Sequence, residues 1–394
     1  MKKGLLYILL LLLTLCAAAQ GSVLRSGAWW KVGVNAEGVY RLTTTDVPAL
    51  QGVSTDSIGL YGGGGDMLSL YNNQTPTGDL QPVSIDIVDH NGNGRFDSGD
   101  ELLFFGEGAG GWRYVAADGR WEFVRHAYAT RNYYYLTVNA PEQQRIETAP
   151  TVTASTEVTS YTAVAHVDND LVNIFGSGQL WMGEKFSSTN PTRSFSLTLP
   201  GNADGVVKLR YALANKSSAT GSFSVSTSSY SNNVAIAGST VYATSLDQLN
   251  SGATSFTFSI TYTAGESSAA GYLDYIELNG HAPLSFGGGQ LLVRNDQALG
   301  SAARFRATGN ASGLRVWEVS AAGAEREMSL TNGTWSDSTI AKVRQVIVKT
   351  LVENEYLDSP KAERLNPVLI NPLLENAIRA AGQEIALPAF NCLN

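Results

Sequence analysis

The segment Asp89–Glu101, DHNGNGRFDSGDE, carries oxygen-bearing side chains at the spacing of a calcium-binding loop. Counted from Asp89 as position 1, the ligand positions 1, 3, 5, 7, 9 and 12 are Asp89, Asn91, Asn93, the carbonyl of Arg95, Asp97 and Asp100. Such oxygens converge because the loop coils around the cation, and Gly94 at position 6 permits the sharp turn. Asp100 is shorter than the glutamate usual at position 12, so we expect weak Ca²⁺ binding unless Glu101 substitutes for it.

A polar hairpin of Asn-Gly turns is the alternative interpretation of this segment. The flanking runs Val83–Val88 and Glu101–Phe105 have the composition of strands, so the loop joins two strands in either case. The calcium interpretation accounts for its acids, which would repel one another in a plain turn.

Nucleophilic catalysis by a thiolate needs a partly exposed cysteine within hydrogen-bond reach of a histidine. Of the two cysteines, Cys16 lies in an N-terminal apolar leader and Cys392 lies in the terminal AFNCLN, with no histidine nearby in sequence. The histidines, none at metal-site spacing such as HExxH, are His90, His126, His166 and His281. We therefore predict no catalytic residue in this chain, and expect hydrogen-bonded or surface histidines.

A loop flanked by glycines carries an aromatic residue and a carboxylate, Trp181 and Glu184, followed by Phe186. We predict that these three residues line a docking groove between domains. The alternative, for this and the other tryptophans and tyrosines, is packing in a β-sheet core.

Residues 1–19 have the pattern of a signal peptide: Lys2 and Lys3, an apolar run from Leu5 to Leu15, and small residues before Gln20. A lipoprotein signal at Cys16 is the alternative, although Leu15 stands where a small residue is expected. The apolar run is shorter than the roughly 20 residues that span a membrane, and we expect no transmembrane segment in the mature chain. The net charge of −8 argues against nucleic-acid binding.

Short alternating runs such as Arg193–Leu199 (RSFSLTL) and Ser255–Tyr262 (SFTFSITY), separated by Gly, Asn, Asp and Ser clusters, predict a mainly β protein. We expect tandem antiparallel β domains that include a jelly-roll-like β-sandwich. The predicted units are an N-terminal β-rich domain (20–150), the sandwich (160–285), a small β segment (286–350) and a short helical or disordered tail (351–394). Glu147–Thr159 is the expected connector, and Asn371–Ala381 has helical spacing.

Several sequence blocks, in order, resemble the region that precedes the catalytic domain in the type IX secretion system sortase (the PorU family, gingipain-type cysteine peptidases). These blocks are Ser26–Leu42, Ile58–Gly65, Phe96–Gly106, Trp112, the region of His126, Asn132–Thr137, His166–Phe186, Tyr272–Asn279 and Val316–Val319. His166–Phe186, HVDNDLVNIFGSGQLWMGEKF, is the most distinctive.

The resemblance implies an exported protein, in the periplasm or at the outer-membrane cell surface of Bacteroidota. The family removes C-terminal sorting signals from cargo and joins the cargo to lipopolysaccharide, using a cysteine and a histidine of a caspase-like domain. We expect that domain to follow the residues matched here. The chain would then be a scaffold or docking region, with the catalytic domain and outer-membrane secretion components as partners. The alternative is a free-standing secreted β-sandwich that binds glycan or an outer-membrane partner.

Overall fold

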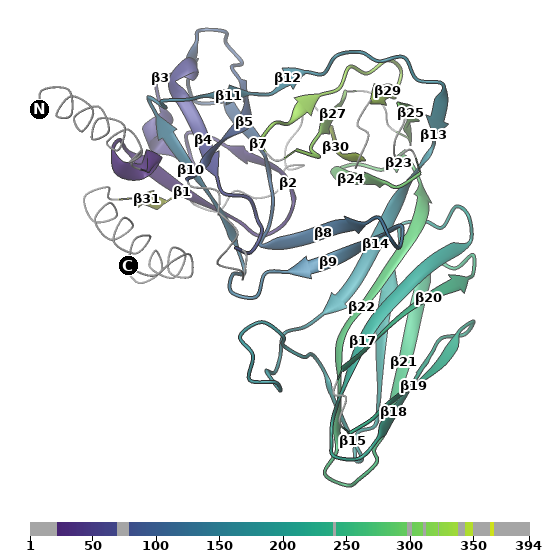
Figure 1. Ribbon diagram of the computed structural model, residues 1–394. Helices are drawn as coiled ribbons and strands as arrows, with labels where there is room; N and C mark the ends of the chain where they lie inside the picture. The colour runs from purple at the N-terminus through teal and green to yellow at the C-terminus, as the bar shows by residue number, and fades with distance from the viewer. Residues whose placement is uncertain are drawn as a thin grey trace, which may run out of the picture.

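The computed structural model describes residues 22–68, 79–238, 242–297, 302–309, 313–321 and 323–337, together with the backbone of 343–349 and 363–365. The predicted signal peptide and the predicted helix at Asn371–Ala381 lie outside these residues, as does Cys392. Among the residues described, no helix is long and apolar enough to cross a membrane. The strands form three groups (Figure 1), and the prediction of a mainly β chain of tandem antiparallel units is confirmed.

The first unit is built on an eight-stranded sheet in the order β2-β7-β5-β4-β10-β1-β31, with β11 beside β5. Its strands are β1 (Trp29–Val34), β2 (Gly38–Leu42), β4 (Ile58–Gly62), β5 (Gln81–Val88), β7 (Glu101–Gly106), β10 (Asn132–Val138), β11 (Gln144–Arg145) and β31 (Glu363–Leu365). Short elements complete the unit: η2 (Val23–Arg25), η3 (Pro48–Leu50), η4 (Thr55–Ser57), β3 (Val53–Ser54) and β6 (Arg95–Phe96). Every residue of β1 is buried, because apolar clusters cover both faces of that strand.

A separate hairpin, β8 (Gly110–Val115) and β9 (Arg120–Arg125), leaves this unit and lies against the second one (Figure 1). Gly110, at the start of the hairpin, has φ = +80°, and a Cβ there would lie 2.2 Å from the carbonyl oxygen of Val124. Only glycine therefore permits the chain to turn here.

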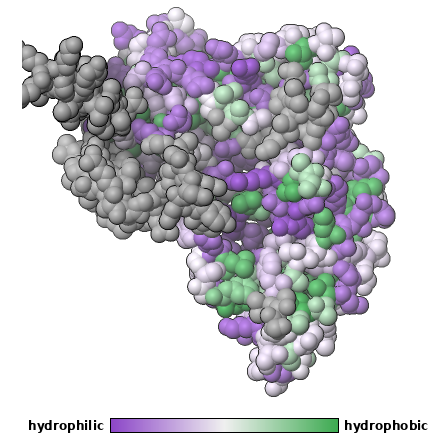
Figure 2. All heavy atoms as spheres, in the orientation of Figure 1, coloured by the Kyte–Doolittle hydropathy of each residue, from purple (hydrophilic) through white to green (hydrophobic). Residues whose placement is uncertain are grey.

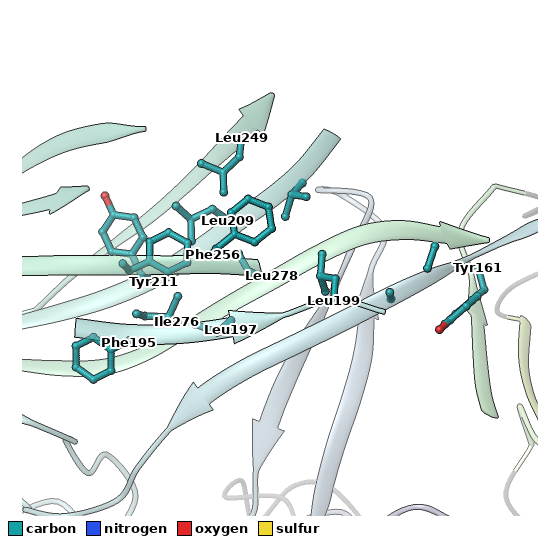
Figure 3. Packing of buried hydrophobic residues seen from close by; sticks show 14 of the residues in the cluster. Tyr161, Phe195, Leu197, Leu199, Leu209, Tyr211, Leu249, Phe256, Ile276 and Leu278 are labelled. Atoms are coloured by element: carbon teal, nitrogen blue, oxygen red, sulfur yellow. The ribbon is translucent and has the colours of Figure 1, made fainter. Parts of the chain in front are cut away.

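The second unit is a sandwich of a five-stranded and a four-stranded antiparallel sheet. The first contains β14 (Ser160–Asp168), β15 (Lys185–Ser187), β17 (Val206–Lys216), β20 (Tyr242–Asn250) and β22 (Ala270–Pro283); the second contains β16 (Thr192–Thr198), β18 (Gly221–Ser226), β19 (Ser231–Ile236) and β21 (Ser255–Thr263). Alternate residues of β21 point inward, as the sequence pattern predicts. Figure 3 shows the apolar core between the sheets, including Phe195, Leu209 and Phe256.

The third unit combines two further small sheets, ordered β12-β28-β27-β30-β24 and β13-β25-β29, and the pair β23-β26. The strands are β12 (Glu147–Thr148), β13 (Thr156–Val158), β23 (Ser285–Phe286), β24 (Gln290–Asn295), β25 (Ala303–Arg306), β26 (Thr308–Gly309), β27 (Leu314–Glu318), β28 (Arg326–Glu327), β29 (Thr334–Asp337) and β30 (Val343–Lys349). The expected connector Glu147–Thr159 is therefore more than a linker. Its strand β12 pairs in parallel with β28, and its strand β13 pairs in parallel with β25.

Candidate functional site

The loop that the sequence singled out for calcium joins β5 to β7 and contains β6. The carboxylate of Asp89 accepts hydrogen bonds from the amides of Gly92 (2.7 Å) and Gly94 (2.8 Å). The bond from Gly94 contributes most to lowering the pKa of Asp89, because it stabilises the ionised form. Gly94 has φ = +74°, the left-handed conformation that the sharp turn at position 6 requires.

The other oxygen-bearing side chains of the loop also accept hydrogen bonds from within it. Asp100 is buried and accepts hydrogen bonds from the amides of His90 (3.0 Å) and Asp97 (2.6 Å). The Asn93 amide donates to Asp97 at 2.6 Å, and the Asn91 oxygen accepts from the Asn93 backbone at 3.0 Å. The loop is therefore held in a coiled shape by hydrogen bonds between its own polar groups.

Two of the predicted ligand positions are restricted by neighbours outside the loop. The Arg95 guanidinium is directed away from the loop by a hydrogen bond of 2.7 Å to the carbonyl of Gly52, which keeps its charge from the position of a bound cation. Glu101 forms an ion pair with Arg41 at 2.9 Å and is thereby drawn away from substituting for Asp100. Within the described parts of the chain, no three His, Cys, Asp or Glu side chains are placed to hold a metal, so an ion here would require the three aspartates of the loop to move closer together.

The predicted docking residues Trp181, Glu184 and Phe186 differ in their burial in the structure. Trp181 and Glu184 are half-buried in the loop between β14 and β15, where the Asn169 amide donates to Glu184 at 2.7 Å. Phe186 is fully buried instead, edge-on to Phe223 in the sandwich core. Its prediction as a groove residue is wrong, because β15 pairs with β22 and turns Phe186 inward.

The exposed part of this region is a different set of side chains. Leu171 is 62% exposed and Tyr128, from the neighbouring first unit, is 65% exposed. The loop that contains Leu171 also carries the partly buried apolar residues Val172, Ile174, Phe175 and Leu180. Tyr128 comes close to the same loop at Gly178. Figure 2 shows hydrophobic residues gathered on the side of the sandwich where this loop lies in Figure 1. We call the set Tyr128, Leu171, Ile174, Phe175, Leu180 and Trp181 the loop patch.

Backbone hydrogen bonds hold the loop patch on the sandwich. Val172 and Met182 form a β-bridge across the loop, and the Gly183 amide donates to the Leu273 carbonyl on β22 at 2.7 Å. At the base of the loop, Arg125 of the hairpin lies 3.2 Å from Asp168 and 3.5 Å from Asp170. The patch is therefore presented by a fixed loop.

The hairpin β8–β9 is joined to the sandwich through polar side chains of β22. Asn279 accepts a hydrogen bond from the Trp121 amide (2.6 Å) and donates one to the Trp121 carbonyl (2.8 Å). Two residues along, the Phe123 amide donates to Glu277 at 3.0 Å. Glu277 also forms an ion pair with Arg210 at 2.9 Å, which counteracts the rise in its pKa that burial causes.

The first and third units are joined in a similar way. The Gln290 side chain accepts from the Val39 amide (2.7 Å) and donates to the Val39 carbonyl (2.8 Å), so it occupies the place of a neighbouring strand on β2. Arg315 bonds Glu327 through two nitrogens and reaches Asp86 of β5 at 2.7 Å. Val39, Phe105 and Trp317 belong to one apolar cluster shared by the two units.

Three histidines, His126, His166 and His281, are held by ring packing or hydrogen bonds. His166 stacks on Phe123 with ring centroids 3.9 Å apart, and burial lowers its pKa to about 4. His126 accepts two backbone hydrogen bonds, from Tyr128 and Ala129. His281 lies between Asp204 (2.6 Å) and Asp296 (2.9 Å) and so links the sandwich to the end of β24. Sequence reasoning could not find this cluster, because its members are far apart along the chain.

A comparison with solved structures aligns the chain with dimeric latent PorU from Porphyromonas gingivalis, at a TM-score of 0.70 and 21% sequence identity. The alignment covers 86% of this chain and 33% of that protein, so the chain spans about a third of the length of PorU. The resemblance inferred from the sequence blocks is confirmed at the level of the fold.

Other comparisons give weaker or no matches. The CBM36-1 domain of a xylanase from the hindgut metagenome of Trinervitermes trinervoides aligns with a TM-score of 0.23 and 14% identity, covering 30% of this chain and 97% of that domain. TmCBM61 aligns with a TM-score of 0.16 and 14% identity, covering 22% and 63%. Both scores are too low to indicate a shared fold. A family model named BrxA matches residues 324–382, and no curated protein matches.

The position of His281 between two carboxylates predicts a pH-dependent stability. Its hydrogen bond to Asp296, supported by that to Asp204, raises its pKa from 6.5 to about 9. The pair of bonds therefore stabilises the folded state fully below about pH 6.5, and this contribution is lost as the pH rises through about 9. We expect the free energy of unfolding, measured by denaturant titration, to fall by on the order of 1–3 kcal/mol across that interval.

His281→Gln is the test variant and His90→Gln, at an exposed loop residue, is its control. The His281 variant should lose this part of the pH dependence and the control should keep it. An identical pH profile for the wild type and His281→Gln would contradict the assignment.

Proposed function

We propose that this chain is a non-catalytic β-scaffold of an exported protein of the PorU type, which holds or docks a separate catalytic domain. The observation that supports it most directly is the agreement in fold with PorU over 86% of the chain. The resemblance of the sequence blocks, and the leader pattern of residues 1–19, support the same assignment and an exported or cell-surface location.

The joints between the units are suited to a scaffold. Asn279, Gln290 and Arg315 each connect two units through hydrogen bonds of defined direction. A contact formed only by apolar side chains permits sliding, whereas paired donors and acceptors fix one orientation. The three units would thus hold a partner domain in a constant position.

The loop patch is the surface that we assign to the catalytic domain. Leu171 and Tyr128 are among the most exposed large apolar side chains in the described residues, and backbone hydrogen bonds hold the loop that carries Leu171. Exposed apolar side chains gathered on one surface mark protein interaction sites. Docking of the catalytic domain would bury Leu171 and Tyr128. The resemblance implies secretion components of the outer membrane as further partners.

The scaffold assignment predicts that the isolated mature chain cleaves no sorting-signal peptide. Because the sequence offers no cysteine–histidine pair, thiol-reactive inhibitors should change nothing. The measurement is the cleavage of a fluorogenic peptide with a C-terminal sorting sequence, with Cys392→Ala as the matched variant. Cleavage by the wild type that is lost in Cys392→Ala would refute the non-enzymatic assignment.

Docking predicts that a PorU-type catalytic domain, expressed separately, binds this chain. Leu171→Glu should weaken binding at least tenfold, since it places a charge in an apolar contact. Leu246→Glu is the matched control, because Leu246 is 47% exposed on β20, outside the loop patch. Affinities are measured by biolayer interferometry. Absence of binding, or equal losses in both variants, would contradict the docking surface and favour the alternative of a free-standing binding module.

We also propose that the Asp89–Glu101 loop binds calcium weakly and that the bound ion stabilises the folded scaffold. Asp89, Asn91, Asn93, Asp97 and Asp100 and the carbonyl of Arg95 would hold the ion. The coiled loop and the left-handed Gly94 support this proposal. The use of the same oxygens in internal hydrogen bonds, together with the shorter Asp100, is the reason to expect weak affinity.

Calcium should raise the melting temperature of the chain, and chelator should lower it. For an extracellular module we expect a dissociation constant on the order of 10⁻⁴–10⁻³ M. Calcium at tenfold that concentration would then stabilise the folded state by roughly 1.4 kcal/mol. The double variant Asp89→Asn/Asp97→Asn should not respond, while Asp56→Asn, at an exposed acid outside the loop, should respond normally. Equal melting temperatures of the wild type with calcium and with chelator would eliminate the site.

A further inference from the structure

The loop between β5 and β7 contains two of the four Asn-Gly pairs of the chain, Asn91-Gly92 and Asn93-Gly94. Both pairs are exposed, and both glycines have left-handed backbone conformations, with φ = +68° for Gly92 and +74° for Gly94. The coil of the loop requires these conformations, which glycine adopts without strain. An exposed Asn-Gly pair is also the sequence at which a peptide chain most readily loses ammonia without an enzyme.

This reaction starts at the backbone nitrogen of the glycine. The nitrogen loses its proton and attacks the side-chain carbonyl carbon of the preceding asparagine. A new C–N bond closes a five-membered succinimide, the C–N bond to the side-chain nitrogen breaks, and that nitrogen takes up a proton and leaves as ammonia. Water then opens the ring at either carbonyl and gives aspartate or isoaspartate. The space around the two glycines is open, since a Cβ built on Gly92 or Gly94 meets nothing within 4 Å.

One carboxylate holds both of the nitrogens that would attack. Asp89 accepts a hydrogen bond from the Gly92 amide through Oδ1 at 2.7 Å and from the Gly94 amide through Oδ2 at 2.8 Å. The bond from Gly94 contributes most to lowering the pKa of Asp89, so this carboxylate is ionised at neutral pH. A negative charge beside an N–H group opposes the loss of its proton, because two anions would then be adjacent.

Hydrogen bonds also hold the asparagine side chains. Oδ1 of Asn91 accepts from the Asn93 amide at 3.0 Å, and Oδ1 of Asn93 accepts from the Arg95 amide at 2.7 Å. The side-chain amide of Asn93 donates to Asp97 at 2.6 Å. Both reacting groups of each pair are therefore fixed, and the glycine amide must leave Asp89 before the ring can close.

We propose that Asn91 and Asn93 are modification sites that convert to aspartate and isoaspartate, and that Asp89 keeps them unreacted. Asp89 is a positioning residue here: it retains two amide protons and takes no part in the bonds that form or break. The loop needs glycine after each asparagine in order to coil, and the same pairs make its backbone chemically labile. Isoaspartate at either position would add a methylene to the backbone and disrupt the coil, so Asp89 sets the lifetime of the loop.

The test compares the wild type with Asp89→Ala during incubation in ¹⁸O-labelled water at mildly alkaline pH. The label marks only the products that form during the incubation. Electron-transfer fragmentation of the peptide that contains both pairs assigns each conversion to Asn91 or Asn93 and separates isoaspartate from aspartate. Chelator is present throughout, so the result does not depend on the proposed calcium binding. Asp89→Ala should convert Asn91 roughly tenfold faster, the change in rate that corresponds to the loss of one hydrogen bond to a charged acceptor.

Two references isolate the effect of Asp89. Asn332, exposed in the turn before β29, belongs to an Asn-Gly pair of the third unit and should convert equally fast in both proteins. Asp97→Ala removes a carboxylate of the same loop that accepts from the side chains of Asn93 and Gln51. Since Asp97 accepts from neither glycine amide, this variant should convert Asn91 at the wild-type rate.

Three results would overturn the proposal. The first is that Asp89→Ala converts Asn91 no faster than the wild type does. The second is an equal acceleration of Asn91 in Asp97→Ala or of Asn332 in Asp89→Ala, since general mobility would then be the cause. The third is a slower conversion in Asp89→Ala, because Asp89 would then act as the base that removes the amide proton.

Discussion

The arrangement of this chain depends on how the open edge of strand β9 is closed. A strand at the edge of a two-stranded hairpin has backbone groups with no ladder partner, and burial of such groups is costly. Here Asn279 and Glu277 of β22 supply the missing partners for Trp121 and Phe123. The sandwich therefore binds the hairpin as a further strand would, but through side chains. Because the hairpin belongs to the first unit, this contact sets the angle between the two largest parts of the molecule.

The same contact explains why β22 departs from the pattern of an ordinary sandwich strand. Its sequence AGYLDYIELNGHAP places Asp274 and Glu277 among apolar residues, and a strand with one solvated face would expose such acids. In the structure both are buried, and burial raises the pKa of Asp274 to about 6. Tyr242 donates to Asp274 at 2.7 Å and Arg210 neutralises Glu277. Glu277 is thus part of a polar interior under the hairpin, whereas Asp274 is accommodated by the hydroxyl of Tyr242 on β20.

Alternation in the sequence predicted individual strands well, as in Ser255–Tyr262, because the period of two reflects only the local burial of one face. It could not predict which strands of different units meet, since this depends on single polar residues such as Gln290 and Asn279. Phe186 shows the limit at a candidate site: its neighbours resemble an exposed loop, but pairing of β15 with β22 turns it into the core. The spacing of the candidate calcium loop could be recognised because its candidate ligands are contiguous in the sequence. The Asp204–His281–Asp296 cluster could not be predicted, because its members come from distant segments.

The parallel pairing of β12 and β13 with the third unit has a consequence for synthesis of the chain. These two strands leave the ribosome before the sandwich, whereas their partners β28 and β25 follow it. The sandwich is therefore an insertion within the third unit, whose sheets remain incomplete until more than a hundred further residues have been translated. Since closing such long loops is slow, the sandwich and most strands of the first unit should form before the third unit does. The third unit then assembles after most of both, and its contacts through Gln290 and Arg315 are added to the existing joint between the hairpin and the sandwich.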